Sequence, residues 1–281
     1  METGPGRSHD VVIDPGSREA IGRLFRGDRF RFEFGMRRGD DRWFDPTPAD
    51  HPALDERRRW LAATPDDCVL WRPEAASVFA EMLELFGASE GPADPAGLAR
   101  VAARWEPDFL LLRHDGDGET RLVGGAVCFP SSWTPAEKLG LTVDAIHSPV
   151  PTVNAELGAR IRTFLGRLPE RAVFERENWG LAAVPDMNMH PRLGLPRLGA
   201  GTPLEQVWLR LERQAFRALP KSGGVLFMIR LTVHPLEEAL ADPEVRAGFV
   251  RALATMPDEI AAYKGVASVR AGLCHRLGAR P

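Results

Sequence analysis

The spacing of hydrophobic residues changes along the chain from a helical to a strand-like period. Between residues 51 and 105, apolar residues recur every three or four positions, which is the period of an amphipathic helix. This spacing predicts three helices, at residues 53–64, 74–87 and 96–105. Asp94 and Pro95 are the residue types that favour a helix start, so they are placed to begin the third helix.

Beyond residue 105 the period shortens to two, and such stretches alternate with helical ones. Runs such as DFLLLRH and VWLRLERQAF, bounded by turns rich in Gly and Pro, are typical of β-strands. Five strands are predicted, at residues 108–114, 120–129, 172–184, 207–219 and 223–233. Helical patterns separate the second strand from the third, the longest at residues 154–168. Two further helices are predicted after the fifth strand, at residues 236–256 and 257–265.

Two strands, then helices, then three strands indicate an α+β fold with an antiparallel five-stranded sheet. PAS domains have the same order, and their helices between the second and third strands close a ligand pocket over the sheet. We therefore predict a PAS-like core at residues 105–235, flanked by an N-terminal arm and helical region (1–104) and a C-terminal helical region (236–281). In the aromatic patch RFRFEFGM (Arg29–Met36) of the arm, phenylalanines alternate with charged residues. This alternation is typical of a strand, or of an arm that anchors the N-terminal region.

The composition excludes several classes of protein. The 281 residues carry 36 basic and 39 acidic side chains, a balance that argues against nucleic-acid binding. No apolar run reaches the roughly 18 residues of a membrane span, and the N-terminal sequence lacks the apolar segment of a signal peptide. The three cysteines lie far apart, so we expect neither a disulfide framework nor a cysteine-based zinc site. These features predict a soluble cytoplasmic protein with no membrane partner.

One histidine has a more specific setting than the others. His147 ends an apolar-periodic helical segment and precedes the rigid sequence S-P-V-P, so it is a candidate axial ligand of a metal or a heme. A structural histidine held by a hydrogen bond is the alternative. No glycine-rich motif for NAD(P), FAD or nucleoside triphosphates occurs. Redox chemistry would therefore need electrons from a separate protein.

Polar residues interrupt the predicted strand at residues 207–219. With a period of two, Arg210, Glu212 and Gln214 share one face of this strand, and Leu211 and Arg213 lie on the other. The polar side chains are either a solvent-facing patch or the polar wall of a ligand site.

Lysine is rare in this chain. Only Lys138, Lys221 and Lys264 occur among the 36 basic residues, and Lys264 follows the single tyrosine, Tyr263. A GC-rich coding background explains the preference for arginine. Because arginine does not replace the compact ammonium group of lysine in every role, the three lysines are candidates for specific functions.

Five motifs occur in order between about Arg121 and Gly265: GGAVCFPSSWTPAEKLG, AIHSPVP, RENW, LRLERQAFRALPKSGGVLFMIR and AAYKG. Together they resemble the heme-dependent oxidative N-demethylase family, which includes the heme subunit of dimethylamine monooxygenase. A weaker match, FGMRRGDDRWF, lies nearer the N-terminus.

The resemblance implies a PAS-like sheet that holds heme b and uses O2 to oxidise a small amine, by N-demethylation or a related oxidation. It implies that His147 is the axial iron ligand. Cys128 is a rival ligand, but it lies in a strand-like run without a loop to present a thiolate. The resemblance further implies that NADPH supplies electrons through a separate flavin and iron–sulfur reductase.

The resemblance also suggests roles for residues within its motifs. Glu212, Arg213 and Gln214 are the candidate catalytic residues: Glu212 would pair with a protonated amine, and Arg213 would suit a heme propionate or a developing negative charge. The candidate heme-binding residues besides His147 are Lys138, Arg176 and Lys221 for the propionates and Trp133 and Trp179 as flat walls. Core packing is the alternative role of both tryptophans.

Departures from the family pattern leave the substrate open. AFRALP replaces a usual TLRRLP at residues 215–220, Glu177 replaces a small polar residue, and the loop at residues 185–203 is rich in Pro, Gly and Met. These changes leave room for a larger amine or a biosynthetic intermediate. Two other functions are compatible with the sequence. One is a heme-based PAS gas sensor, and the lack of a visible output domain argues against it. The other is a small-molecule-binding protein without heme.

Overall fold

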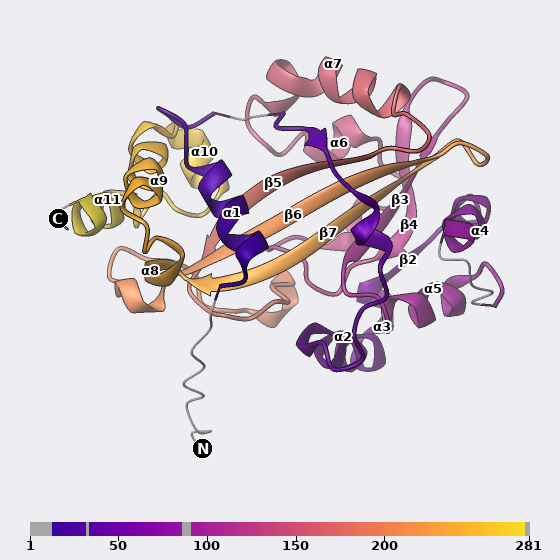
Figure 1. Ribbon diagram of the computed structural model, residues 1–281, viewed down its shortest axis with the longest axis horizontal. Coiled ribbons are helices and arrows are strands. Elements are labelled where there is room, and N and C mark those ends of the chain that lie inside the picture. Colours follow the sequence, from indigo (N-terminus) through magenta and orange to yellow (C-terminus); the bar gives the residue numbers. More distant parts are fainter. Residues whose placement is uncertain (1–12, 32–33, 86–90, 279–281) are drawn as a thin grey trace.

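The computed structural model describes residues 13–31, 34–85 and 91–278. Its centre is one antiparallel sheet of seven strands with the order β1-β5-β6-β7-β3-β4-β2 (Figure 1). The strands are β1 (Arg37–Arg38), β2 (Val69–Trp71), β3 (Asp108–His114), β4 (Thr120–Ala126), β5 (Val173–Ala182), β6 (Trp208–Leu219) and β7 (Gly224–Pro235). The predicted α+β class with an antiparallel sheet is confirmed.

The sheet contains two more strands than the five that the sequence predicts. The predicted strands correspond to β3–β7, and the additional β1 and β2 lie at the two edges. A strand of two or three residues shows no recognisable period, which is why both were missed. In the aromatic patch, residues 32–33 lie outside the described residues, and β1 follows directly after it. Because β1 and β2 come from the predicted N-terminal region, residues outside 105–235 help to build the sheet.

Helices surround the sheet, and none that the structure describes is both long enough and apolar enough to cross a membrane. The α-helices are α1 (Pro15–Leu24), α2 (Pro52–Ala63), α3 (Pro65–Cys68), α4 (Ala75–Leu85), α5 (Pro95–Ala102), α6 (Val143–His147), α7 (Val153–Gly166), α8 (Leu236–Ala239), α9 (Pro243–Thr255), α10 (Asp258–Tyr263) and α11 (Arg270–Gly278). Four 3-10 helices complete the set: η1 (Asp41–Phe44), η2 (Pro135–Lys138), η3 (Pro191–Leu193) and η4 (Leu204–Gln206).

Helix caps explain where the predicted helices begin and where one of them breaks. The Asp94 side chain accepts a hydrogen bond from the N–H of Gly97 and starts α5, as the sequence predicts. The helix expected at residues 236–256 is divided into α8 and α9, because Asp242 caps a new helix whose first residue is Pro243. The predicted end of the second helix, at residue 87, lies outside the described residues.

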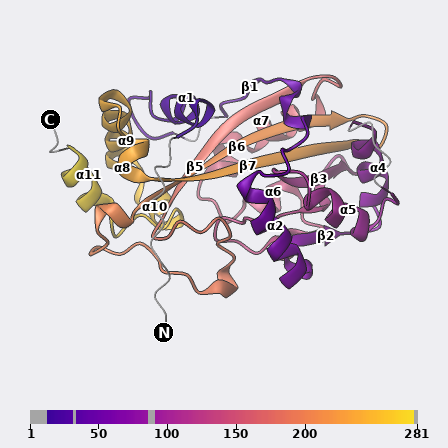
Figure 2. The ribbon, with the colours of Figure 1, turned by 60° about the horizontal axis from the view of Figure 1, so that its bottom comes forward.

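The two faces of the sheet differ in how completely they are covered. We call one the covered face, on which Leu211, Ala215, Leu226 and Met228 have no exposed surface. At one end it packs against α1, α9, α10 and α11, and at the other against α4 and α5. Figure 2 shows α1 on one side of β5–β7 and the loop that follows β5 on the other.

We call the opposite face, which carries Phe216, Phe227, Ile229 and Val233, the open face. All four residues are half-buried although β6 and β7 are central strands of the sheet. Helices α6 and α7, which connect β4 to β5, cover one end of this face, where Phe164 of α7 packs edge-on against Phe216. The open face therefore leaves apolar surface accessible in the middle of the sheet.

Candidate functional site

A row of polar side chains crosses the open face beside these apolar residues. It comprises Arg176 and Asn178 of β5 and Arg210, Glu212 and Gln214 of β6. The strand register places Arg176 opposite Gln214 and Asn178 opposite Glu212. Side chains at such paired positions lie on the same face and within reach of each other. The alternation of the sequence thus brings five polar groups together on one face.

Glu212 is held by three hydrogen bonds at the centre of this row. One carboxylate oxygen accepts from the Ser131 hydroxyl at 2.8 Å, and the other accepts from the amides of Asn178 at 3.1 Å and Gln214 at 2.9 Å. Arg210 donates to the Ser131 oxygen at 3.2 Å and thereby fixes it in place. The carboxylate therefore has a defined position, as a group that orients a ligand requires.

His147 is the last residue of α6, a helix whose N-cap is Thr142. Its Nδ1 atom is buried, and no described residue forms a hydrogen bond with it. Burial lowers the pKa of His147, and the nearby charge of Arg176 lowers this pKa further. The imidazole is therefore neutral at neutral pH, which is the form that binds a metal.

Arg176 of the polar row and Lys264 beside it are half-buried cations. Burial lowers the pKa of Arg176, and no described residue forms a hydrogen bond with its Nε atom. Lys264, which follows α10, donates from Nζ to the backbone oxygen of Trp179 at 2.7 Å and lies 4.9 Å from the centre of the Trp179 ring. Burial lowers the pKa of Lys264 to about 8. These two cations, Arg176 and Lys264, line one cavity of about 230 Å³.

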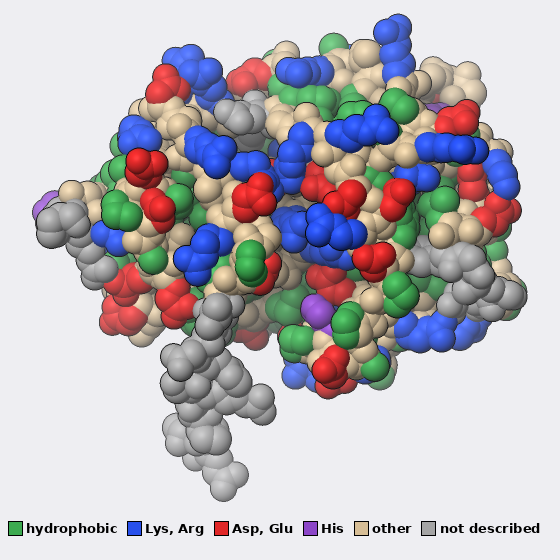
Figure 3. All heavy atoms as spheres, viewed as in Figure 1, with side chains coloured by type: hydrophobic (Ala, Val, Ile, Leu, Met, Phe, Trp, Pro, Cys, Tyr) green, Lys and Arg blue, Asp and Glu red, His purple; other side chains and the backbone are tan. Residues whose placement is uncertain are grey.

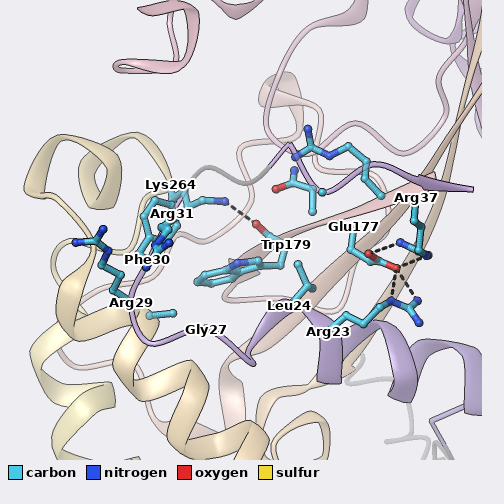
Figure 4. Close-up of a pocket in the computed structure, with 14 residues that line it drawn as sticks. Arg23, Leu24, Gly27, Arg29, Phe30, Arg31, Arg37, Glu177, Trp179 and Lys264 are labelled. Carbon is cyan, nitrogen blue, oxygen red and sulfur yellow. Dashed lines mark hydrogen bonds and ion pairs between the residues drawn. The ribbon is translucent and has the colours of Figure 1, made fainter. Parts of the chain in front are cut away.

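This cavity, which we call the edge pocket, opens at the edge of β5 beyond the two residues that pair with β1. In Figure 4, Lys264 lies above the Trp179 ring at one end, and Glu177 meets Arg23 and Arg37 at the other. Glu177 lies 2.6 Å from Arg23 and also pairs with Arg37. The edge pocket is therefore rich in cations, and the cations at one end have a carboxylate partner.

The structure separates the remaining sequence-predicted residues. Arg213 and Trp179 lie on the covered face, where Arg213 approaches Gly16 in the first turn of α1 and Trp179 packs against Phe25 and Phe249. The other candidates, Trp133, Lys138, Lys221 and Cys128, lie elsewhere, and each has a distinct setting.

Trp133 is half-buried against the apolar cluster of α6 and α7, and Lys138 ends η2 in the same segment. Lys221 lies in the β6–β7 turn, 71% exposed, and forms an ion pair with Glu84. Cys128 is fully buried, and a hydrogen bond with Cys68 together with burial raises the pKa of its thiol. Of these four, Trp133 and Lys138 lie nearest to His147 along the chain, in the stretch just before α6.

Three residues contribute to the polar site that the sequence analysis did not assign to it. Ser131 and Asn178 hold Glu212, and Lys264 reaches the edge of β5 from beyond the C-terminal end of the sheet. Signals for them existed: Asn178 belongs to the motif RENW, Ser131 to the first motif and Lys264 to AAYKG. The sequence cannot show that residues so far apart along the chain meet at one place.

A comparison with protein families gives one match that covers these residues. The family described as haem-dependent oxidative N-demethylase, alpha subunit-like, matches residues 88–274, about two-thirds of the chain. The matched span contains β3–β7, the polar row of the open face, His147 and Lys264.

Proposed function

The chain belongs to the haem-dependent oxidative N-demethylase alpha subunit-like family, and on this premise we propose that it binds heme b on the open face of its sheet and oxidises an amine there with O2. The observation that carries the proposal is accessible apolar surface on the central strands, together with a neutral histidine, His147, whose buried Nδ1 has no hydrogen-bond partner among the described residues. The family description implies heme, and the arrangement of the open face suits it.

The residues present fit a large, flat and mostly apolar group. Phe216 and Phe227 stack with ring centres 4.5 Å apart, and with the half-buried Ile229 they form an apolar floor. Helices α6 and α7, between β4 and β5, cover an end of the same face, as the PAS-like interpretation requires. We propose that His147 ligates the iron, that Trp133 forms a wall and that Lys138 pairs with a propionate.

Bound heme would supply an iron centre that activates O2. The protein's own residues would bind and orient the amine. A protonated amine needs a negative partner, and Glu212 is the carboxylate in the polar row. Its hydrogen bonds to Ser131, Asn178 and Gln214 keep it from turning away, so an amine bound to it would have a fixed position.

Electrons would come from a partner. The sequence has no motif for binding NAD(P) or flavin, and the family is described as an alpha subunit, which implies further subunits. We propose that NADPH supplies electrons through a separate flavin and iron–sulfur reductase.

The absorption spectrum of the protein after expression with ample heme tests the proposal. We expect a Soret band at one heme per chain, and O2 consumption that depends on an amine once a reductase is added. His147→Ala should abolish stoichiometric heme binding. His190→Ala and His234→Ala are matched controls, because each of these buried histidines also has a ring nitrogen without a partner among the described residues.

The outcomes separate the alternatives. Full heme occupancy and an unchanged spectrum in His147→Ala would show that another residue ligates the iron. Heme binding without amine-dependent O2 consumption would favour a gas sensor. A protein without any Soret band would contradict both heme functions.

A further inference from the structure

Arg176 is a half-buried cation that forms no ion pair with a described residue. It lines the edge pocket, its Nε has no hydrogen-bond partner among the described residues, and burial lowers its pKa. Glu212 and Glu177 are close enough to raise this pKa, but the hydrogen bonds and ion pairs that hold these carboxylates go to other residues. A buried charge without a partner is costly, so such a group favours an anionic ligand.

Lys264 faces the same pocket, and its partners among the described residues at hydrogen-bond distance are neutral. Its Nζ contacts a backbone oxygen and the face of the Trp179 ring. Among the charges near it, Glu212 raises its pKa and Arg176 lowers it, so Arg176 and Lys264 repel each other across the pocket. An anion between these two cations would remove the repulsion.

Most other charged groups near the edge pocket form ion pairs with carboxylates of the protein. Arg23 and Arg37 share Glu177, and Arg31 pairs with Asp28. Figure 3 shows basic and acidic side chains interleaved over the face that carries α1. Against this background, Arg176 and Lys264 are half-buried cations that form no ion pair within the described part of the chain, so they are available to a ligand.

We infer that the substrate carries a carboxylate in addition to its amine, as an N-methylated amino acid does, and that Arg176 and Lys264 bind this carboxylate. The inference rests on the proposed function, in which Glu212 binds the amine. One carboxylate beside two cations that have no ion-pair partner among the described residues is complementary to a zwitterion, whereas a simple dialkylamine would supply no partner for either cation. The cavity of about 230 Å³ has room for a small amino acid, since a water molecule takes a share of about 30 Å³.

A carboxylate could reach Arg176 from two sources, the substrate or a heme propionate, and calorimetry can distinguish them. The probes are N,N-dimethylglycine and its methyl ester, which share the amine and differ in the carboxylate. We expect the acid to bind at least tenfold more tightly than the ester, in both heme-free and heme-loaded protein. Binding of the acid to the heme-free protein alone would assign the cations to a propionate and overturn the inference, as would equal binding of acid and ester.

Substitutions then test the two cations. Arg176→Met and Lys264→Met should each weaken binding of the acid by 10- to 100-fold and change binding of the ester by less than twofold. Arg171→Met, an exposed arginine just before β5, is the matched control and should leave both affinities unchanged. Near-ultraviolet circular dichroism verifies that each variant is folded. A folded Arg176→Met protein that retains full affinity for the acid would refute the assignment.

The pH dependence gives a second readout for Lys264. Because its pKa is about 8, the affinity for the acid should fall as the pH rises from 7 to 9, and Lys264→Met should remove this fall. The other titratable groups near Lys264 are Arg176, Glu212, Tyr263, Arg29 and Arg31. An unaltered pH profile in Lys264→Met would show that another group binds the proton.

These tests are separable from those of the proposed function. If the protein binds no heme, the proposed function fails, and the heme-free arm still shows whether the edge pocket selects a carboxylate. If heme binds and simple amines are oxidised while the acid and the ester bind equally, the inference fails and the proposed function stands.

Discussion

Arg57 and Arg176 are two arginines beside the sheet whose surroundings differ. Arg57, on α2, has no exposed surface and donates to Asp108 at 2.6 Å and to the backbone oxygen of Ala102 at 2.9 Å. Asp108 in turn accepts from the backbone N–H groups of Cys128 and Phe129. Arg176, on β5 toward the other side of the sheet, is half-buried, and no described residue forms an ion pair with it.

This difference separates a part of the molecule that stabilises the fold from a part for which we propose ligand binding. At the α2 end, the buried charge of Arg57 is paired with Asp108, and this ion pair joins a helix to β3 and to the chain that leaves β4, although the Nη2 atom of Arg57 has no hydrogen-bond partner among the described residues. At the β5 edge, Arg176 carries a half-buried charge that a ligand would pair with. The apolar residues of the two faces repeat this contrast, because Leu211, Ala215, Leu226 and Met228 of the covered face have no exposed surface, whereas Phe216, Phe227, Ile229 and Val233 of the open face are half-buried.

The largest effect on stability should come from Arg57. Arg57→Met leaves the Asp108 carboxylate buried without its cation, so we expect the free energy of unfolding to fall by about 3–5 kcal/mol. Arg58→Met is the control on the same helix: Arg58 is 43% exposed and pairs with the exposed Asp55, so the change should be about 0.5 kcal/mol or less. Urea denaturation followed by circular dichroism measures both. Similar losses in the two variants would contradict the structural role of the buried pair.

Glu212 should show the reverse behaviour, a large effect on binding with little effect on heme content. Glu212→Gln removes the negative charge that a protonated amine needs, and losing a buried charge partner typically costs about two to three decades in affinity. Titration of the heme-loaded protein with secondary and tertiary amines, followed by absorption spectra, measures this loss. Glu205→Gln, an exposed glutamate in η4, is the control. Equal spectral shifts in wild type and Glu212→Gln would mean that Glu212 is not the partner of the amine.

The smallest effect is expected for the stability of Arg176→Met without ligand. Since Arg176 forms no ion pair with a described residue, its removal should leave the free energy of unfolding unchanged or raise it by about 1 kcal/mol. The same urea denaturation measures it, side by side with Arg57→Met. A loss of stability as large as that of Arg57→Met would show that Arg176 has a structural partner, and the contrast between the two arginines would disappear.

Much of the fold could be predicted from local patterns. The five strands β3–β7 and most of the helices lie where the hydrophobic period predicts them, and the cap at Asp94 begins its helix as expected. The predicted sharing of one strand face by Arg210, Glu212 and Gln214 is also confirmed. These features depend on residues within a few positions of each other, so the sequence contains the whole signal. The roles of the predicted site residues stay predictions.

Local patterns in the sequence are enough to establish the type of each long element and the face on which each strand residue lies, and five motifs identify the family. Which strands are neighbours and which charges find a partner depend on how the whole chain folds. Arg57 meets Asp108 across 51 positions and Lys264 meets the Trp179 oxygen across 85, and no local period encodes either distance. The physical reason is that a strand's period fixes where its side chains point, whereas the cost of a buried charge depends on whatever the folded chain places beside it.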